Sequence, residues 1–174
     1  MQALGFLLDL APGRAQVSQQ TETFLNEPVH PDARLLLGYW REHAHTGGLV
    51  VGRHIPSRRL AKLLENLALY EYCTQSDDFR VRLAGFSLVR RFGSDITGHC
   101  LKEVLSREDH ARHRAALLSV LETGVPLSLD VKITSPDRPL MHFEILVVGA
   151  MASDGKTALL LSGQFHFDHA RRQR

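Results

Sequence analysis

Three stretches in the second half of the chain are rich in apolar residues, and the first two carry them at alternate positions. Residues 125–133 read VPLSLDVKI, residues 141–151 read MHFEILVVGAM, and residues 158–167 read ALLLSGQFHF. A period of two is typical of strands with one buried face. The segment Ser153-Asp154-Gly155-Lys156 favours a tight hairpin between the last two stretches. We therefore predict a three-stranded antiparallel meander.

The middle of the chain combines two strands with three helices. Residues 67–73 (LALYEYC) form the first predicted strand, and the alternating Phe79, Val81 and Leu83 begin the second. A short helical turn ending near Phe92, a turn at 93–95 and a second short helix after Gly98 follow. The long helix expected at 107–123 begins with the capping residue Ser106 and ends at Gly124.

Two helices are expected before the first strand. One begins near Pro31-Asp32 and stops at Gly47-Gly48; the other follows Ser57 and carries leucines at helical spacing. In the first helix, Leu36 and Trp40 lie four residues apart and Tyr39 extends the same apolar stripe. Such a stripe needs a cover, which is either the chain's own sheet or the helix of a partner.

The pattern predicts an α+β fold: a five-stranded antiparallel sheet with helices over one face, plus an N-terminal helical extension. Within it we distinguish four parts of the chain. They are a mobile N-terminal arm (1–30), the helical extension (31–66), the sheet domain (67–168) and a basic tail (169–174).

Composition narrows the class of protein without identifying it. The 21 Lys and Arg residues nearly balance 19 Asp and Glu residues, so charge gives no reason to expect nucleic acid or a membrane as partner. No apolar run approaches the roughly 18 residues of a membrane span, and the N-terminus lacks the features of a signal peptide. The two cysteines form no disulfide framework. We expect a cytoplasmic protein.

Motifs for catalysis are missing from the sequence. It contains no nucleophile elbow, no phosphate-binding glycine loop and no zinc-binding His-Glu-x-x-His helix. Asp95, beside Gly93 and Thr97, is best interpreted as a residue that hydrogen-bonds the turn backbone. Of the ten histidines, His110 and His113 stand out because their spacing to Leu117 turns them toward the apolar face of the long helix. We expect no enzyme.

The central segment FRVRLAG…FGSDITGxxLxEVL, with Tyr39-Trp40 before it, resembles a family of small bacterial PAS-like proteins. The resemblance implies a sensory or protein-interaction domain in signal transduction, with an unidentified signalling protein as partner. It also implies a ligand site between the sheet and the long helix, and the residues we assign to it are His113, Leu117, Leu121, Phe143 and Phe165. Because PAS domains pair through flanking helices, the resemblance implies a homodimer through Leu36, Tyr39 and Trp40.

The resemblance suggests two cofactors to test. Haem-binding relatives use a histidine ten residues before the Thr-Gly that ends the long helix, and His113 has that spacing; a surface histidine is the alternative. Flavin-binding relatives use a cysteine, but Cys100 is one residue out of place, which rotates its sulfur by ~100° on a helix. We therefore expect no flavin, and the identity of any ligand stays open.

Two further functions remain as alternatives. A ligand-free interaction adaptor would fill the same space with its own leucine and phenylalanine side chains. A small α+β enzyme would instead need a carboxylate or histidine with a perturbed pKa deep in the pocket.

Overall fold

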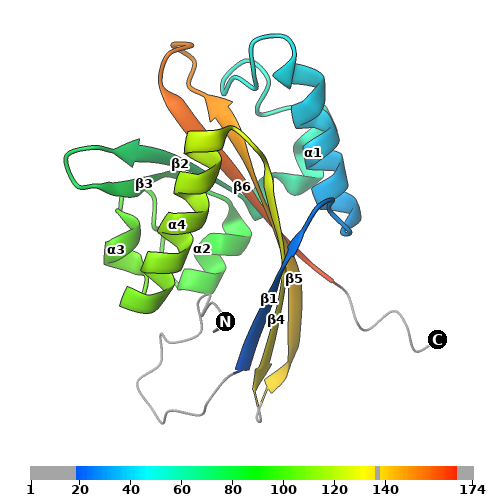
Figure 1. The fold of residues 1–174 in the computed structure, drawn as a ribbon, viewed down its shortest axis with the longest axis vertical. Helices are drawn as coiled ribbons and strands as arrows, with labels where there is room; N and C mark the ends of the chain where they lie inside the picture. The colour runs from blue at the N-terminus through cyan, green and yellow to red at the C-terminus, as the bar shows by residue number, and fades with distance from the viewer. Residues whose placement is uncertain (1–18, 136–137, 168–174) are drawn as a thin grey trace.

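The computed structural model describes residues 19–135 and 138–167, and its centre is a six-stranded antiparallel sheet (Figure 1). The strands follow the order β1-β4-β5-β6-β2-β3. Their bounds are β1 Gln19–Leu25, β2 Leu67–Cys73, β3 Asp78–Ala84, β4 Leu127–Ser135, β5 Arg138–Met151 and β6 Ala158–His166. The helices are α1 Pro31–Ala44, the 3-10 helix η1 Arg58–Asn66, α2 Phe86–Phe92, α3 Leu101–Val104 and α4 Arg107–Thr123. The predicted α+β class is confirmed.

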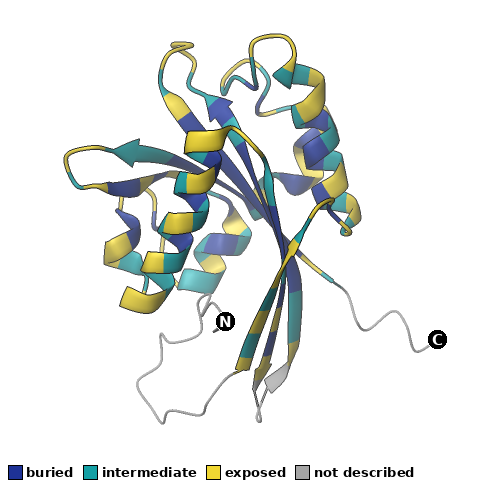
Figure 2. Ribbon diagram, in the orientation of Figure 1, coloured by how far each residue is buried: buried dark blue, intermediate teal, exposed yellow. Residues whose placement is uncertain are grey.

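Helices cover both faces of the sheet, and not one face as expected. Helices α2, α3 and α4 lie over one face, which we call the inner face, while α1 and η1 lie over the outer face (Figure 1). The cause is β5, whose Phe143 and Ile145 point into the inner core while Leu146 and Val148 point into the outer core. A strand that is apolar on both faces needs cover on both. Figure 2 shows the central strands buried and the outward helix faces exposed.

The sixth strand, β1, comes from the segment that we expected to be a mobile arm. Residues 19–25 pair antiparallel with β4, from Gln19 opposite Thr134 to Leu25 opposite Ser128. Its sequence, QQTETFL, is polar because β1 lies at the edge of the sheet and its partner β4 already supplies the apolar residues of the core. The expectation for residues 19–25 is therefore wrong. Residues 1–18 and the basic tail 169–174 lie outside the described residues.

Glu22 of β1 faces the inner side, because it stands opposite Val131 of the inner core. Burial raises the pKa of Glu22 to about 7, against the opposing effect of the Arg112 guanidinium on α4. The edge strand thus places an ionisable group against the long helix.

A buried carboxylate fixes the start of α1. Glu144 of β5 is fully buried and accepts hydrogen bonds from the backbone N–H groups of Val29 (3.0 Å) and His30 (2.6 Å) and from the Ser128 hydroxyl (2.7 Å). His30 caps the helix, since its Nδ1 accepts from Asp32 N at 3.1 Å. Three donors satisfy the buried carboxylate and tie the helix to the sheet.

The Leu36, Tyr39 and Trp40 stripe packs on the chain's own sheet. Leu36 and Tyr39 are buried in the outer core, and Trp40 donates its indole N–H to the carbonyl of Gly149 at 2.8 Å. Of the two covers considered for this stripe, the structure therefore shows the chain's own sheet. While α1 stays docked on the sheet, Leu36 and Tyr39 are unavailable to a partner. The helical extension is a structural layer of the same unit as the sheet.

Gly98 should be sensitive to substitution because its backbone is left-handed, with φ +90°, and its N–H donates to the carbonyl of Val81 at 2.7 Å. A Cβ there would meet no atom within 4 Å, so the cost is conformational. We predict that Gly98→Ala lowers the free energy of unfolding by about 1–2 kcal/mol in chemical denaturation.

The matched control is Gly38→Ala in the interior of α1, where a Cβ would also meet nothing within 4 Å. There the same change should stabilise by about 0.5–1 kcal/mol, because alanine favours helix. Equal effects at the two positions would contradict the assignment of the left-handed turn.

Candidate functional site

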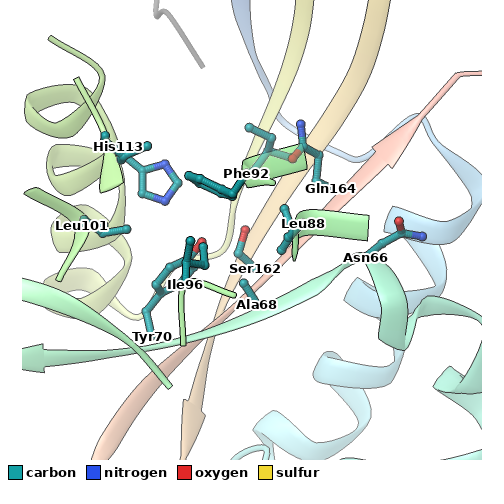
Figure 3. Close-up of a pocket in the computed structure, with 12 residues that line it drawn as sticks. Asn66, Ala68, Tyr70, Leu88, Phe92, Ile96, Leu101, His113, Ser162 and Gln164 are labelled. Carbon is teal, nitrogen blue, oxygen red and sulfur yellow. The ribbon is translucent and has the colours of Figure 1, made fainter. Parts of the chain in front are cut away.

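A small cavity lies in the inner core, between the sheet and helices α2, α3 and α4 (Figure 3). Its volume is about 20 Å³, which is room for about one water molecule. The lining residues are Asn66, Ala68, Tyr70, Leu88, Phe92, Ile96, Leu101, Leu105, His113, Ile145, Ser162 and Gln164.

Polar side chains from three elements converge on this cavity. Tyr70 of β2, His113 of α4, and Ser162 and Gln164 of β6 are each less than 9% exposed. The Tyr70 and His113 rings meet edge to face, with centroids 5.6 Å apart. Gln164 Nε2 is buried and has no hydrogen-bond acceptor among the residues that the structure describes. Four buried polar groups therefore surround a space about the size of one water molecule.

The five residues predicted to form the ligand site do not all line the cavity. His113 lines the cavity, while its role as a cofactor ligand stays a prediction. Leu117 and Phe143 are buried in the inner core and Leu121 packs against it, but none of the three lines the cavity. Phe165 belongs to the outer core, so the expectation that it faces this site is wrong.

Sequence reasoning missed Ser162 and Gln164 because it took the large apolar residues of β6 as inward-facing. The ladder sets Ser162 opposite Val147 and Gln164 opposite Ile145, and both partners are inner-core residues. With α1 covering the outer face, Phe165 and Leu161 point outward and are still buried. The alternation itself was the available signal, but it does not say which face is which.

A second buried carboxylate ties helices α3 and α4, which cover the cavity, to strand β3. Asp78 of β3 is 1% exposed and accepts from Phe79 N at 2.8 Å, Lys102 N at 3.0 Å and His110 Nε2 at 2.9 Å. Although burial opposes it, these hydrogen bonds keep the pKa of Asp78 below its usual value. The contacts join β3, α3 and α4, and His113 lies one turn beyond His110.

The cavity does not fit the cofactors that the resemblance suggested. Pockets for drug-sized ligands occupy roughly 300–1,000 Å³, far more than the 20 Å³ here, so neither haem nor flavin fits. Cys100 is buried beside Ser76, with Sγ 3.8 Å from the hydroxyl oxygen, and does not line the cavity. Within residues 19–135 and 138–167, no three His, Cys, Asp or Glu side chains are grouped to hold a metal ion.

His113 should make folding sensitive to acid. Burial lowers its pKa from 6.5 to about 4, so the native state holds the neutral imidazole while the unfolded chain takes up a proton below pH 6.5. The contribution of the buried neutral imidazole to the free energy of unfolding is complete above pH 6.5. It falls by roughly 3 kcal/mol as the pH drops to 4. We predict that His113→Gln flattens the plot of unfolding free energy against pH in this window.

His45→Gln, at an exposed position after α1, is the control and should leave the plot unchanged. An identical acid slope in wild type and His113→Gln would show that the imidazole is not buried as described.

Comparison with known proteins agrees with the architecture. A family model described as PAS domain matches residues 29–164, which include α1, η1, β2 to β5 and all but the last two residues of β6. No curated protein matches the chain. Among the described residues, no helix combines the length and apolar character needed to cross a membrane. The match covers most of the chain and spans both helical layers and the cavity between sheet and α4, and the chain therefore belongs to the PAS domain family.

Proposed function

We propose that this PAS domain is a non-enzymatic sensory or protein-interaction module of bacterial signal transduction that binds a small polar molecule in the cavity between the sheet and α4. The observation that carries the proposal is the buried Gln164 amide, whose Nε2 lacks an acceptor among the described residues. An unsatisfied buried donor costs about 1–3 kcal/mol, and a bound guest with an acceptor atom removes that cost.

A chain of contacts connects the cavity with the surface of the domain. His113 contacts Tyr70 inside, and one turn away His110 holds Asp78, which also accepts from the backbone of Lys102 at the start of α3. A guest that shifts α4 therefore acts on α3 and β3 through the same carboxylate. We propose that an unidentified signalling protein recognises this changed surface.

The ligand-free adaptor remains the second candidate, because the cavity holds only about 20 Å³ and is otherwise closed by Leu88, Phe92 and Leu101. An enzyme is less well supported. His113 meets the condition of a buried histidine with a perturbed pKa, but a pKa of about 4 makes it a weak base at neutral pH.

Native mass spectrometry of the gently purified protein tests the proposal. We expect a small molecule to accompany the folded wild type, to be released on unfolding, and to be missing from Gln164→Leu. The control is Gln75→Leu, an exposed position in the β2–β3 turn, which should retain the molecule. Wild type without any bound mass, with partner binding unchanged in Gln164→Leu, would favour the adaptor.

We also propose that the protein is a homodimer, because PAS domains commonly pair through flanking helices, although Leu36 and Tyr39 are packed on the chain's own sheet and do not form its interface while α1 stays docked. Because Leu36 is fully buried against its own sheet, Leu36→Glu should unfold the outer core, so the oligomeric state is best measured on wild type. Sedimentation velocity over a rising concentration series should show a dimer. A species that stays monomeric at the highest concentration would end this proposal.

A further inference from the structure

An open pocket of about 220 Å³, which we call the outer pocket, lies on the outer face of the sheet where β1 leads into α1 (Figure 1). It is lined by Leu25, Asn26, Pro28, Leu37, Trp40, Arg41, Val125, Pro126, Ser128 and Leu146. The inner cavity measures about 20 Å³ and shares no lining residue with it. The outer pocket is therefore a separate space on the other side of the sheet.

Three residues on adjacent strands form the floor of the outer pocket. Leu25 of β1 stands opposite Ser128 of β4, which in turn stands opposite Leu146 of β5. Leu146 belongs to the outer core, and residues directly opposite one another share a face, so the whole row faces outward. Because serine has the smallest side chain of the three, the row leaves a hollow between the two leucines.

Apolar side chains form most of the walls. Leu37 and Trp40 lie three positions apart on α1 and therefore project from the same side of the helix. Val125 and Pro126, just before β4, add further apolar surface, and Val125 is 63% exposed. Apolar surface that remains exposed around a hollow is typical of a binding site.

Ser128 is the buried polar group of the outer pocket, with 5% of its surface exposed. Its hydroxyl donates its one proton to Glu144 Oε1 at 2.7 Å, and its oxygen accepts no hydrogen bond from the other described residues. A hydroxyl oxygen has two lone pairs, so Ser128 can still accept a hydrogen bond but cannot donate one to a guest. The pocket therefore suits a molecule that carries a donor.

The charges around the outer pocket disfavour an ionic guest. Arg41 at the rim already pairs with Glu27 at 2.6 Å, and both side chains are more than half exposed. Behind Ser128, both oxygens of the buried Glu144 carboxylate accept hydrogen bonds. An anion would approach this carboxylate, and a cation would exchange its water for apolar walls while Glu144 is already satisfied by three donors.

From this geometry we propose that the outer pocket binds a small neutral molecule with an apolar ring and one hydroxyl group, of the phenol class. The hydroxyl donates to Ser128 Oγ, and the ring lies among Leu37, Trp40 and Val125. An apolar cavity of about 150 Å³ binds benzene, so this volume accommodates a single ring with one or two substituents. The indole of Trp40 adds an aromatic contact for such a ring.

A guest in the outer pocket acts on the attachment of α1. It contacts Leu37 and Trp40 of the helix and accepts support from Ser128, which also holds Glu144. Glu144 in turn receives the backbone N–H groups that precede α1. Because such a guest binds only the folded chain, it should raise the temperature of unfolding. This second site does not depend on occupancy of the inner cavity.

Titration of the full chain with p-cresol, followed by ¹H–¹⁵N NMR, tests the proposal. Trp40 is the only tryptophan, so its indole N–H, which donates to the carbonyl of Gly149 at 2.8 Å, gives a single signal at the pocket. We expect a saturable shift of this signal. The ether p-methylanisole, which has no proton to donate, should bind at least fivefold more weakly, and the anion p-toluate at least tenfold more weakly.

The variants separate occupancy of the pocket from general effects on the fold. Val125→Phe should weaken p-cresol binding at least tenfold because the added ring takes up space in the pocket. The control is Val29→Phe, since Val29 is similarly exposed (53%) but does not line the pocket, and this variant should bind p-cresol like wild type. Ser128→Ala should remove the preference for p-cresol over p-methylanisole. Thermal unfolding verifies each fold, and if Ser128→Ala does not fold, the two ligands still test the hydroxyl on wild type.

Gln164→Leu distinguishes the two sites. It should bind p-cresol like wild type, because Gln164 lines the inner cavity only. Loss of p-cresol binding in this variant would place the guest in the inner cavity and end the proposal of an outer site.

Three further results would overturn the proposal: no saturable shift of the Trp40 signal, equal affinities for p-cresol and p-methylanisole, or unchanged affinity in Val125→Phe. A Trp40 signal that shifts with protein concentration alone would assign the outer pocket to a second copy of the chain and would also end it. None of these results affects the bound mass expected for the inner cavity, so the proposed function stands or fails separately.

Discussion

The two-sided burial of β5 and β6 is the constraint on which the rest of the structure depends. Along β5, Ile145 and Val147 enter the inner core while Leu146 and Val148 enter the outer one, and β6 divides its residues in the same way. At roughly 25 cal/mol per Å² of apolar surface, leaving either face in water would remove a large part of the folding free energy. The helices of both layers are therefore required, and α1 with η1 is as integral as α4.

Two buried carboxylates attach these helical layers to the sheet. Glu144 receives the backbone N–H groups that precede α1, and Asp78 receives one from the start of α3 and the imidazole of His110 on α4. Both are satisfied by three hydrogen bonds, which is the condition for burying a charged group without a large penalty. Apolar contact alone is not directional, so these carboxylates define where each layer sits.

Against this background, the cavity contains a buried polar group that lacks a hydrogen-bond partner in the part of the chain that the structure describes. Gln164 Nε2 has no acceptor among the described residues. Gln164 lies on the inner face of the sheet, which is covered by helices that Asp78 holds in place. This incomplete donor, set among fully satisfied structural carboxylates, is the feature on which the proposed ligand site rests.

The sequence by itself determined the features that depend on near neighbours. Ser106 and Gly124 fix α4 at 107–123 because caps act within one turn, and the hairpin at 153–156 follows from its own residues. Alternation located β2 to β6 for the same reason. Tertiary structure alone decided the rest: β1 pairs with β4 more than a hundred positions away, and Glu144 binds Val29 across 115 residues. Which face of β6 is inner, and hence that Gln164 and not Phe165 lines the cavity, depends on α1 covering the outer side. A period of two shows that a strand has two faces, but only the layers packed on each face decide what each one meets.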